Sequence, residues 1–393
     1  MKKTHNKIEA EALNNQLTEE IKEIEVENKE QFQGYSPKEQ KIEKTKKGKK
    51  KKTPKQIFLR ILVVIGILLV TLIAGFFILR AIGKSSLFRK NVNMEKTIEG
   101  ASVKDNGNLV VYKGHKYRYN ENITSILFMG VDRESINSDE EFLKENGAGQ
   151  SDTLFLAVLD TASGKTSLIN ISRDIMTDVK MYDSKGKYKG TTPRQICLAY
   201  AYGDGKQRSC TNTVEAVSKL LYGIPIDSYM SMNLSTISVL NDAIGGVTVQ
   251  VQGDLTSIDP ALKEGANVTL LGDQAEAYVR TREEEPVDAN NARMQRQQQY
   301  IASYIQKAVQ EVRGDIMLPV DLFNLVSENA VTNLSATKLV YLATAATRTS
   351  FSSNDILNIE GTVKTGDTQY AEYYPDETKL FETILKVFYT QVS

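Results

Sequence analysis

An uncharged apolar run is the feature that most limits what this chain can fold into. It reads ILVVIGILLVTLIAGFFIL over residues 61–79, and Arg60 and Arg80 bracket it. A helix of this length and composition can span the hydrocarbon core of a bilayer. A cleaved signal peptide is the competing interpretation, but signal peptides lie at the extreme N-terminus and have a shorter apolar core. We therefore predict one transmembrane helix over residues 57–82.

The segment before this run has a strong charge asymmetry. Residues 1–56 begin with an acidic stretch and end in the lysine-rich stretch KIEKTKKGKKKKTPKQ. Neither has enough apolar residues for a core, so we predict a disordered or loosely helical tail. Because lysines are far denser before the run than after it, the tail should be cytoplasmic and the residues after 83 outside. Beside a membrane span, we expect the lysines to contact anionic lipid rather than nucleic acid.

The outer part alternates apolar β-rich runs with helical ones, which is typical of an α/β layer fold. We predict a polar stalk over residues 83–120, a domain over 121–313, and an extension over 314–393 that packs on the domain. Strands are predicted over residues 123–131, 153–160, 165–172, 226–234 and 247–252. Helices are predicted over residues 192–203, 212–223, 235–246, 271–280, 291–312 and 373–389, with most of 314–350 also helical. In the second helix, Asn212 is the predicted N-cap and Gly223 the stop.

The chain has only two cysteines, Cys197 and Cys210, and both fall on the predicted outer side. A pair of cysteines in an oxidising compartment favours a disulfide, so we predict that these two are joined. A zinc site would need more ligands than the two cysteines and His115 supply. The other histidine, His5, is on the predicted cytoplasmic side, which argues against a Ser-His-Asp catalytic site.

Charged residues stand at the ends of the first three predicted strands. Asp132 and Arg133 follow the first strand, Asp152 lies just before the second strand's apolar core, and Arg173 and Asp174 follow the third. Loops at strand ends line the binding crevice of an open α/β sheet. Arginine suits phosphate there, because its planar guanidinium forms paired charge-assisted hydrogen bonds. Taken alone, each position is equally compatible with an ordinary loop charge.

The segment AYVRTREEEPVDANNARMQRQQQYI, residues 277–301, concentrates charge of both signs. Its four arginines are Arg280, Arg282, Arg293 and Arg296. A mixed run of this kind is compatible with a solvated, salt-bridged surface. It is also compatible with an arginine cluster that binds a phosphate and leaves the acidic residues outside. The residues alone leave both interpretations open.

Six stretches together resemble the LytR-CpsA-Psr family of bacterial cell-wall enzymes in order and spacing. They are ILFMGVDRE, SDTLFLAVLD, INISRDIMTDV, IPIDSYMSMNL, NDAIGGVTVQV, and AYVRTR followed by ARMQRQQQYI, within residues 121–305. The resemblance implies a mixed central β-sheet sandwiched between helices. It also implies a phosphotransferase anchored by a single span in a Gram-positive cell membrane. Such an enzyme moves a teichoic acid or capsule-type glycopolymer from undecaprenyl pyrophosphate to peptidoglycan outside the cell.

The resemblance also assigns roles to individual residues. The pyrophosphate-binding positions fall on Arg173, Arg280, Arg282, Arg293 and Gln297. The acids near a divalent metal, Mg²⁺ or Mn²⁺, fall on Asp132 and Asp152, and we expect catalysis to depend on Asp132, Asp152, Arg173 and Arg293. Arg296 is expected to be exposed. Many family members have an Asp three residues before the helix arginine, where this chain has Asn290, so a third acid stays unassigned.

The lipid tail of such a substrate needs an apolar channel, which we predict residues 195–202 and 236–244 to line. Two other functions are compatible with the sequence. One is a non-catalytic protein that binds or senses a lipid-linked glycan, and the other is a hydrolase that only cleaves the pyrophosphate. Nothing in the sequence identifies the glycopolymer.

Overall fold

The computed structural model describes residues 75, 77–84, 92–94, 96–133, 147–183, 185–233, 235–281, 289–349, 351–365 and 370–392. All of them belong to one compact unit of the chain. The predicted N-terminal tail, most of the predicted transmembrane helix and Arg282 lie outside the described residues. Within the described part of the chain, no helix combines the length and the apolar character that crossing a membrane requires.

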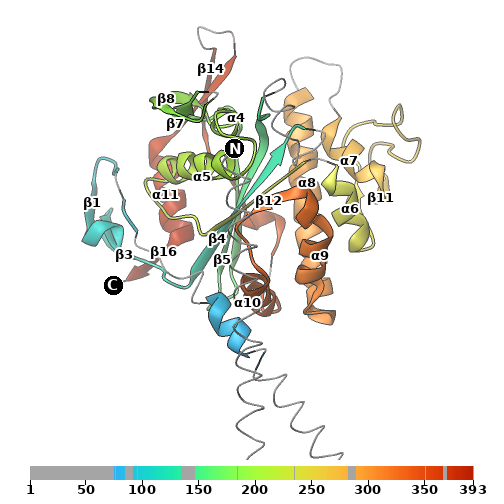
Figure 1. Ribbon diagram of the computed structural model, residues 1–393, viewed down its shortest axis with the longest axis horizontal. Helices are drawn as coiled ribbons and strands as arrows, with labels where there is room; N and C mark the ends of the chain where they lie inside the picture. The colour runs from blue at the N-terminus through green and yellow to red at the C-terminus, as the bar shows by residue number, and fades with distance from the viewer. Residues whose placement is uncertain are drawn as a thin grey trace, which may run out of the picture. The chain divides into compact units, whose positions relative to one another are not determined.

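A six-stranded mixed sheet forms the centre of the fold (Figure 1), in the spatial order β12-β9-β4-β5-β6-β13. Its strands are β4 (Ile123–Val131), β5 (Ser151–Asp160), β6 (Thr166–Ile171), β9 (Ser228–Asn233), β12 (Ala330–Thr332) and β13 (Ile356–Asn358). The pairs β4–β9 and β6–β13 are parallel, and the other neighbours are antiparallel. The predicted strands are present, and β5 lies inside the sheet as expected.

Helices cover both faces of this sheet (Figure 1). One face packs on α5 (Gln207–Leu220) and α11 (Glu377–Phe388), and the other lies towards α8 (Ala289–Gly314), α9 (Leu318–Val326) and α10 (Ala336–Ala346). Side chains alternate along a strand, so Leu127 and Met129 enter the first core while Ile126 and Phe128 face the second side. The mixed sheet between helices that the resemblance implied is confirmed.

Shorter elements surround these layers. The remaining helices are α4 (Leu198–Ala201), α6 (Thr236–Ala243) and α7 (Asp273–Arg280), with 3-10 turns η1 (Asp105–Gly107), η2 (Ser327–Asn329) and η3 (Ser353–Asp355). Three two-stranded sheets are β7 (Met176–Tyr182) with β8 (Tyr188–Gln195), β10 (Val247–Gln250) with β11 (Asn267–Leu270), and β14 (Gly361–Thr365) with β15 (Ala371–Pro375). A four-stranded sheet joins β1 (Ala101–Lys104), β2 (Leu109–Tyr112) and β3 (His115–Tyr119) to β16 (Tyr389–Val392).

Three helix predictions differ from the structure. The helix predicted over residues 373–389 begins at Glu377, because residues 371–375 pair with β14 as strand β15. The helix predicted over residues 192–203 is reduced to α4, because residues 188–195 pair with β7 as strand β8. The helix predicted from Asn212 begins five residues earlier, so Asn212 is not its N-cap. Its amide Nδ2 instead donates to the carbonyl oxygens of Ala199 (2.6 Å) and Lys180 (3.0 Å). Gly223 has φ +87° and donates its N–H to the Ser218 carbonyl, as a residue that ends a helix does.

The chain after α8 is integral to the fold. It supplies both edge strands of the central sheet, β12 and β13, and the helix α11 that covers one face. It also supplies β16, which pairs with β3 in the region predicted as a polar stalk. Residues 314–393, predicted as an extension, thus supply part of the central sheet itself.

A helix over residues 77–84 packs on α10. Arg80 Nε donates to Thr344 Oγ1 at 3.1 Å, and the Arg80 guanidinium lies 5.8 Å from the centre of the Tyr341 ring. Glycine is needed at position 83, because a Cβ atom there would overlap the carbonyl group of Thr337. Figure 1 shows this helix in blue beneath α10, at the opposite end of the fold from the β7–β8 hairpin.

Candidate active site

The ends of three strands meet at one edge of the central sheet. Because β5 is antiparallel to both β4 and β6, its first residues lie beside the last residues of its neighbours. Val131 at the end of β4 pairs with Ser151 at the start of β5. Asp132, Asp152 and Arg173 therefore gather at this edge, as the positions of the predicted strands indicated.

Arg173 is the centre of this cluster. Its Nη1 lies 2.5 Å from Asp152 Oδ1, and its Nη2 donates to Gln150 Oε1 at 2.6 Å. Its Nε lies 3.8 Å from Asp174 Oδ1, and Cys197 Sγ lies 3.8 Å from Nη2. The guanidinium is thus held by Asp152 on β5, by Gln150 just before that strand, by Asp174, which follows Arg173, and by Cys197, just before α4.

The charges of the cluster influence one another. Burial is the strongest effect on the Asp174 carboxyl and raises its pKa, while the positive charges of Arg173 and Arg293 oppose that rise. Burial also disfavours the charged form of Arg173, but Cys197, Asp152 and Asp174 outweigh it and raise the arginine pKa. Arg293 on α8 therefore belongs to the same electrostatic cluster as the strand-end residues.

Two helices bring the remaining predicted site residues. Arg280 ends α7, and its Nη2 lies 3.7 Å from Asp132 Oδ1, while its Nη1 lies 3.0 Å from Glu276 Oε1. The Arg280–Asp132 pair is more than half exposed, so water screens it strongly. Gln297 Nε2 donates to the Val279 carbonyl at 3.0 Å and ties α8 to α7. Asn290 lies in the first turn of α8, and its side chain lies outside the described part.

Arg296 has a different place from the one predicted. The expectation of an exposed side chain is wrong, because Arg296 is fully buried. Its Nε donates to the Tyr278 carbonyl at 3.1 Å and its Nη2 to the Thr281 carbonyl at 2.6 Å. The last carbonyls of a helix have no partner within the helix. Arg296 therefore holds the C-terminal turn of α7 against α8.

The predicted disulfide is also wrong in this structure, because Cys197 and Cys210 are both free and buried. The two sulfur atoms have different surroundings. Cys197 Sγ lies 3.7 Å from Gln150 Oε1, whereas Cys210 Sγ lies 4.0 Å from the Val331 carbonyl oxygen. Burial raises the pKa of Cys197 to about 11 and that of Cys210 to about 12.

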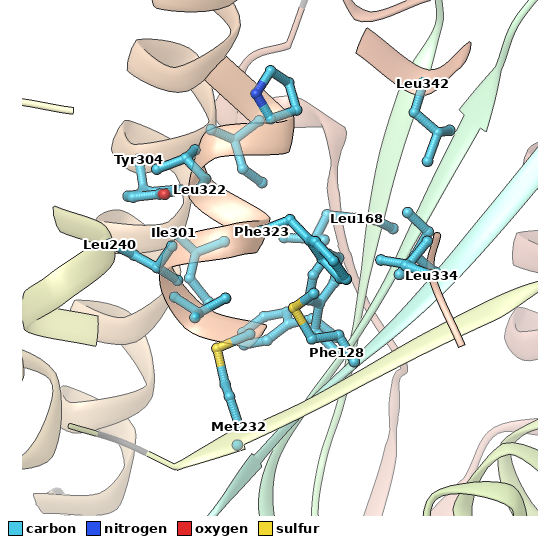
Figure 2. Close-up of a pocket in the computed structure, with 18 of the residues that line it drawn as sticks. Phe128, Leu168, Met232, Leu240, Ile301, Tyr304, Leu322, Phe323, Leu334 and Leu342 are labelled. Atoms are coloured by element: carbon cyan, nitrogen blue, oxygen red, sulfur yellow. The ribbon is translucent and has the colours of Figure 1, made fainter. Parts of the chain in front are cut away.

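An apolar cavity of about 500 Å³ lies between the sheet and the helices α6, α8, α9 and α10. Figure 2 shows side chains from strands and helices that point into it, including Phe128, Leu168, Met232, Leu240, Ile301, Tyr304, Leu322, Phe323, Leu334 and Leu342. Ile237 and Leu240 of α6 line the cavity, as predicted. Residues 195–202 do not line it, because Ile196 and Tyr200 are buried in the core on the other face of the sheet.

One end of this cavity lies beside the charged cluster. Its lining includes Gln297, Thr153 next to Asp152, Val279 next to Arg280, and Gly130 two residues before Asp132. Along β4 and β5 the lining then extends to Thr124 and Leu159, towards the opposite sheet edge. A cluster of polar and charged side chains therefore lies at one end of a long apolar cavity.

The model of the LytR_cpsA_psr family matches residues 82–387, which is most of the chain. The chain belongs to the LytR-CpsA-Psr family. A Bacillus licheniformis protein named polyisoprenyl-teichoic acid--peptidoglycan teichoic acid transferase TagU is 26% identical over 291 residues, 74% of this chain and 81% of the relative. A Bacillus subtilis protein of the same name is 29% identical over 211 residues, 54% of this chain and 60% of that protein. The match to this second LytR-CpsA-Psr relative thus spans less than two thirds of its length.

Two solved structures resemble this LytR-CpsA-Psr protein in fold. Bacillus subtilis TagV is 24% identical with a TM-score of 0.50, covering 67% of this chain and 95% of that chain. Protein gbs0355 from Streptococcus agalactiae is 22% identical with a TM-score of 0.52, covering 68% and 86%. At these identities the likeness shows the fold alone, and it agrees with the mixed sheet and its two helical layers.

Two contacts of Arg173, those with Gln150 and Cys197, were not predicted. Gln150 had no recognisable signal, because a glutamine before a strand is an ordinary residue. Asp174 was named from the sequence, since it directly follows Arg173 at a strand end. Within the described part, no group of three or more His, Cys, Asp or Glu side chains is arranged to hold a metal ion. The carboxylates of the cluster are those of Asp132, Asp152 and Asp174, each beside an arginine.

Proposed function

We propose that this protein is a membrane-anchored phosphotransferase that moves a glycopolymer from undecaprenyl pyrophosphate to peptidoglycan. The observation that carries the proposal is the charged cluster at one end of the apolar cavity. A lipid pyrophosphate has the same two-part character, with a charged head that arginines bind and a hydrocarbon tail that needs burial. The names of the TagU relatives, which describe a teichoic acid transferase acting on peptidoglycan, support the same reaction class.

Membrane attachment is supported by the helix over residues 77–84. Four large apolar side chains of this helix are exposed to solvent, namely Phe77, Ile78, Leu79 and Ile82. Phe77, Ile78 and Leu79 are the last three residues of the nineteen-residue apolar run and Ile82 lies just after it, which suits a position at the bilayer surface. The helix docks on α10, whose Leu339, Leu342, Ala343 and Ala346 line the cavity. The proposed lipid site thus has one wall next to the point where the chain would leave the bilayer.

A divalent cation such as Mg²⁺ or Mn²⁺ fits the donor set of this site. Mg²⁺ is usually bound by one or two carboxylates together with substrate phosphate oxygens and water. Asp132 and Asp152 supply two carboxylates at adjacent strand ends. When bound, the ion would add positive charge next to the phosphate oxygens and help to orient them. Both carboxylates face arginines, so binding of the cation and of the pyrophosphate would redistribute these ion pairs together.

The reaction needs positioning and charge neutralisation more than a covalent nucleophile. An acceptor sugar hydroxyl attacks the phosphorus atom that carries the glycopolymer. A P–O bond to the acceptor forms as the bond to the bridging oxygen breaks, and undecaprenyl phosphate leaves with that oxygen and its electron pair. Asp132 or Asp152 accepts the hydroxyl proton. Arg173, Arg280 and Arg293 surround the phosphates, with Arg282 and Gln297 as further pyrophosphate contacts.

One experiment separates this proposal from a hydrolase and from a non-catalytic binding protein. Full-length protein in detergent micelles is incubated with a glycan linked to undecaprenyl pyrophosphate and Mg²⁺, with and without a peptidoglycan acceptor. A transferase yields polymer joined to the acceptor. Release of polymer that is equally fast without the acceptor would indicate a hydrolase, and binding without any product in either reaction would indicate a binding protein.

A further inference from the structure

A second cavity, of about 520 Å³, lies along a different face of α8 from the apolar cavity. The described residues that line it are all uncharged, and most carry amide or hydroxyl groups: Gln252, Gln295, Gln298, Gln299, Ala302, Ser303, Gln306, Ser353, Ile356 and Asn358. We call this cavity the amide groove. Its lining is polar where that of the apolar cavity is hydrophobic, so two faces of α8 border cavities of opposite character.

The groove follows one stripe of α8. The helix residues in its lining are spaced at intervals of three and four from Gln295 to Gln306, which places them on one face. A stripe with this spacing is normally apolar and buried against a neighbouring element. Here it is rich in glutamine, and Gln295 and Gln306 at its two ends are exposed. A polar stripe that borders a cavity is available to a polar ligand.

Hydrogen bonds fix the amides in the middle of the groove. Asn358 Oδ1 accepts from Gln298 Nε2 at 2.9 Å and from Asn170 Nδ2 at 3.0 Å. Gln299 Nε2 donates to the Gln250 carbonyl at 2.8 Å, and Gln299 Oε1 accepts from the Tyr278 hydroxyl at 2.6 Å. An amide has two N–H donors and an acceptor oxygen, so each side chain keeps capacity beyond these bonds. The amide side chains of the groove are therefore oriented before a ligand binds.

The groove adjoins the charged cluster. Asn170 is three residues before Arg173 in the chain, and three residues span at most roughly 11 Å. Asn358 of the groove pairs with Asn170 on β6. A ligand in the groove would therefore have one end near the strand end that carries Arg173. Because the groove lies near the charged cluster, it suits a substrate of the same reaction.

We infer that the amide groove binds the N-acetylated glycan strand of the acceptor, an inference that rests on the proposed function. A teichoic acid carries a phosphate in each repeat and would call for arginine or lysine. The groove instead offers amide and hydroxyl groups, which pair with sugar hydroxyls and acetamido groups without any charge. It thereby places an acceptor hydroxyl at the site where Asp132 or Asp152 accepts its proton.

The test replaces Gln295, Gln298 and Gln306 by Ala, singly and together, in the full-length protein in detergent micelles. Gln310→Ala is the matched control, since Gln310 is an exposed glutamine on the same helix outside the groove. The probe is an N-acetylglucosamine tetramer, whose binding is measured by calorimetry without any donor. Each hydrogen bond lost should weaken its binding roughly two- to tenfold, whereas the control should bind normally. Thermal unfolding checks that each variant is folded.

The same variants are then compared in the transfer reaction. The triple variant should raise KM for the acceptor at least tenfold and leave binding of undecaprenyl pyrophosphate unchanged. Normal tetramer binding by the folded triple variant, or tighter binding of a glycerol phosphate oligomer than of the tetramer, would overturn the inference. Because the tetramer experiment contains no donor, it is decided separately from the proposed function, which fails only if no polymer is transferred by the unaltered protein.

Discussion

Arg173 Nη1 lies 2.5 Å from Asp152 Oδ1, so the end of β6 is joined to the start of β5 through one ion pair. Both side chains are less than a third exposed, and Gln150 Oε1 holds the other terminal nitrogen of Arg173 at 2.6 Å. Residues on rigid strands that are supported by further hydrogen bonds keep a binding geometry before the substrate arrives. The guanidinium of Arg173 is therefore held in one orientation by Asp152 on β5 and by Gln150 just before it.

Arg173→Lys should not preserve pyrophosphate binding. A lysine ammonium is a single point of charge and cannot reproduce the planar fork that meets Asp152 and Gln150 together. Loss of one charge-assisted hydrogen bond should weaken binding of undecaprenyl pyrophosphate roughly 10- to 100-fold. Calorimetry on the full-length protein in micelles measures this. Arg118→Lys on an exposed position of β3 serves as the control, and full affinity of the Arg173 variant would contradict the role.

Asp152→Asn and Asp132→Asn should separate chemistry from binding. If these carboxylates serve the cation and the acceptor proton, each variant should lower the rate of transfer by roughly 10²-fold or more. The lipid should still bind, since the arginines remain, and the response of the reaction to added Mg²⁺ should become weaker. A titration of Mg²⁺ in the transfer assay, with EDTA as the zero point, measures both effects. Variants with normal transfer at every Mg²⁺ concentration would exclude this assignment.

The sequence predicted the central sheet because its strands are strongly apolar and alternate in burial. The predicted strands also gave the positions of the strand ends, and these positions predicted that Asp132, Asp152 and Arg173 lie close together. The β7–β8 hairpin could not be predicted in the same way, because YKGTTPRQ has almost no apolar residues. Its pairing depends on the strand beside it rather than on its own composition.

Arg293 and Arg296 could not be distinguished from sequence alone. They are three residues apart on one helix and have the same chemistry. What separates them is the end of α7, whose Tyr278 and Thr281 carbonyls need a donor that reaches them from α8. The cysteine pair shows the same limit, because spacing and compartment say nothing about whether two thiol groups face each other.

Arg296→Ala should destabilise the fold, unlike Arg280→Ala. The buried Arg296 satisfies two carbonyls at the end of α7, and leaving these groups without a donor should cost about 2–4 kcal/mol of unfolding free energy. Arg280 is more than half exposed, so its replacement should change stability by no more than about 0.5 kcal/mol. Urea unfolding followed by circular dichroism compares the two. Equal losses would show that Arg296 has no special structural role.

Cys197 and Cys210 should react with a thiol reagent only after unfolding, and without prior reduction. Both are fully buried, and their pKa values of about 11 and about 12 keep them as neutral thiols in the folded state at pH 8. Raised pKa values mean that these groups add stability below their unfolded pKa near 9 and lose it as the pH rises towards 11 and 12. Intact mass after iodoacetamide treatment should show no label when native and two in denaturant. If the denatured protein took up no label until a reductant was added, the two cysteines would have to be joined in a disulfide.

Ala157→Phe should shorten the lipid tail that the protein can bind. Ala157 on β5 lines the apolar cavity, so a phenyl ring there would occupy space that the proposed tail needs. Each methylene group displaced into water forfeits about 0.8 kcal/mol, which should weaken binding of undecaprenyl pyrophosphate more than tenfold. Farnesyl pyrophosphate, with the same head and a much shorter tail, should bind as it does to the unaltered protein. Ala162→Phe, on an exposed turn after β5, is the control for adding a phenyl ring elsewhere. If the folded Ala157 variant weakened the binding of both ligands equally, or of neither, the tail would have to lie outside this cavity. The charged cluster alone would then bind the lipid.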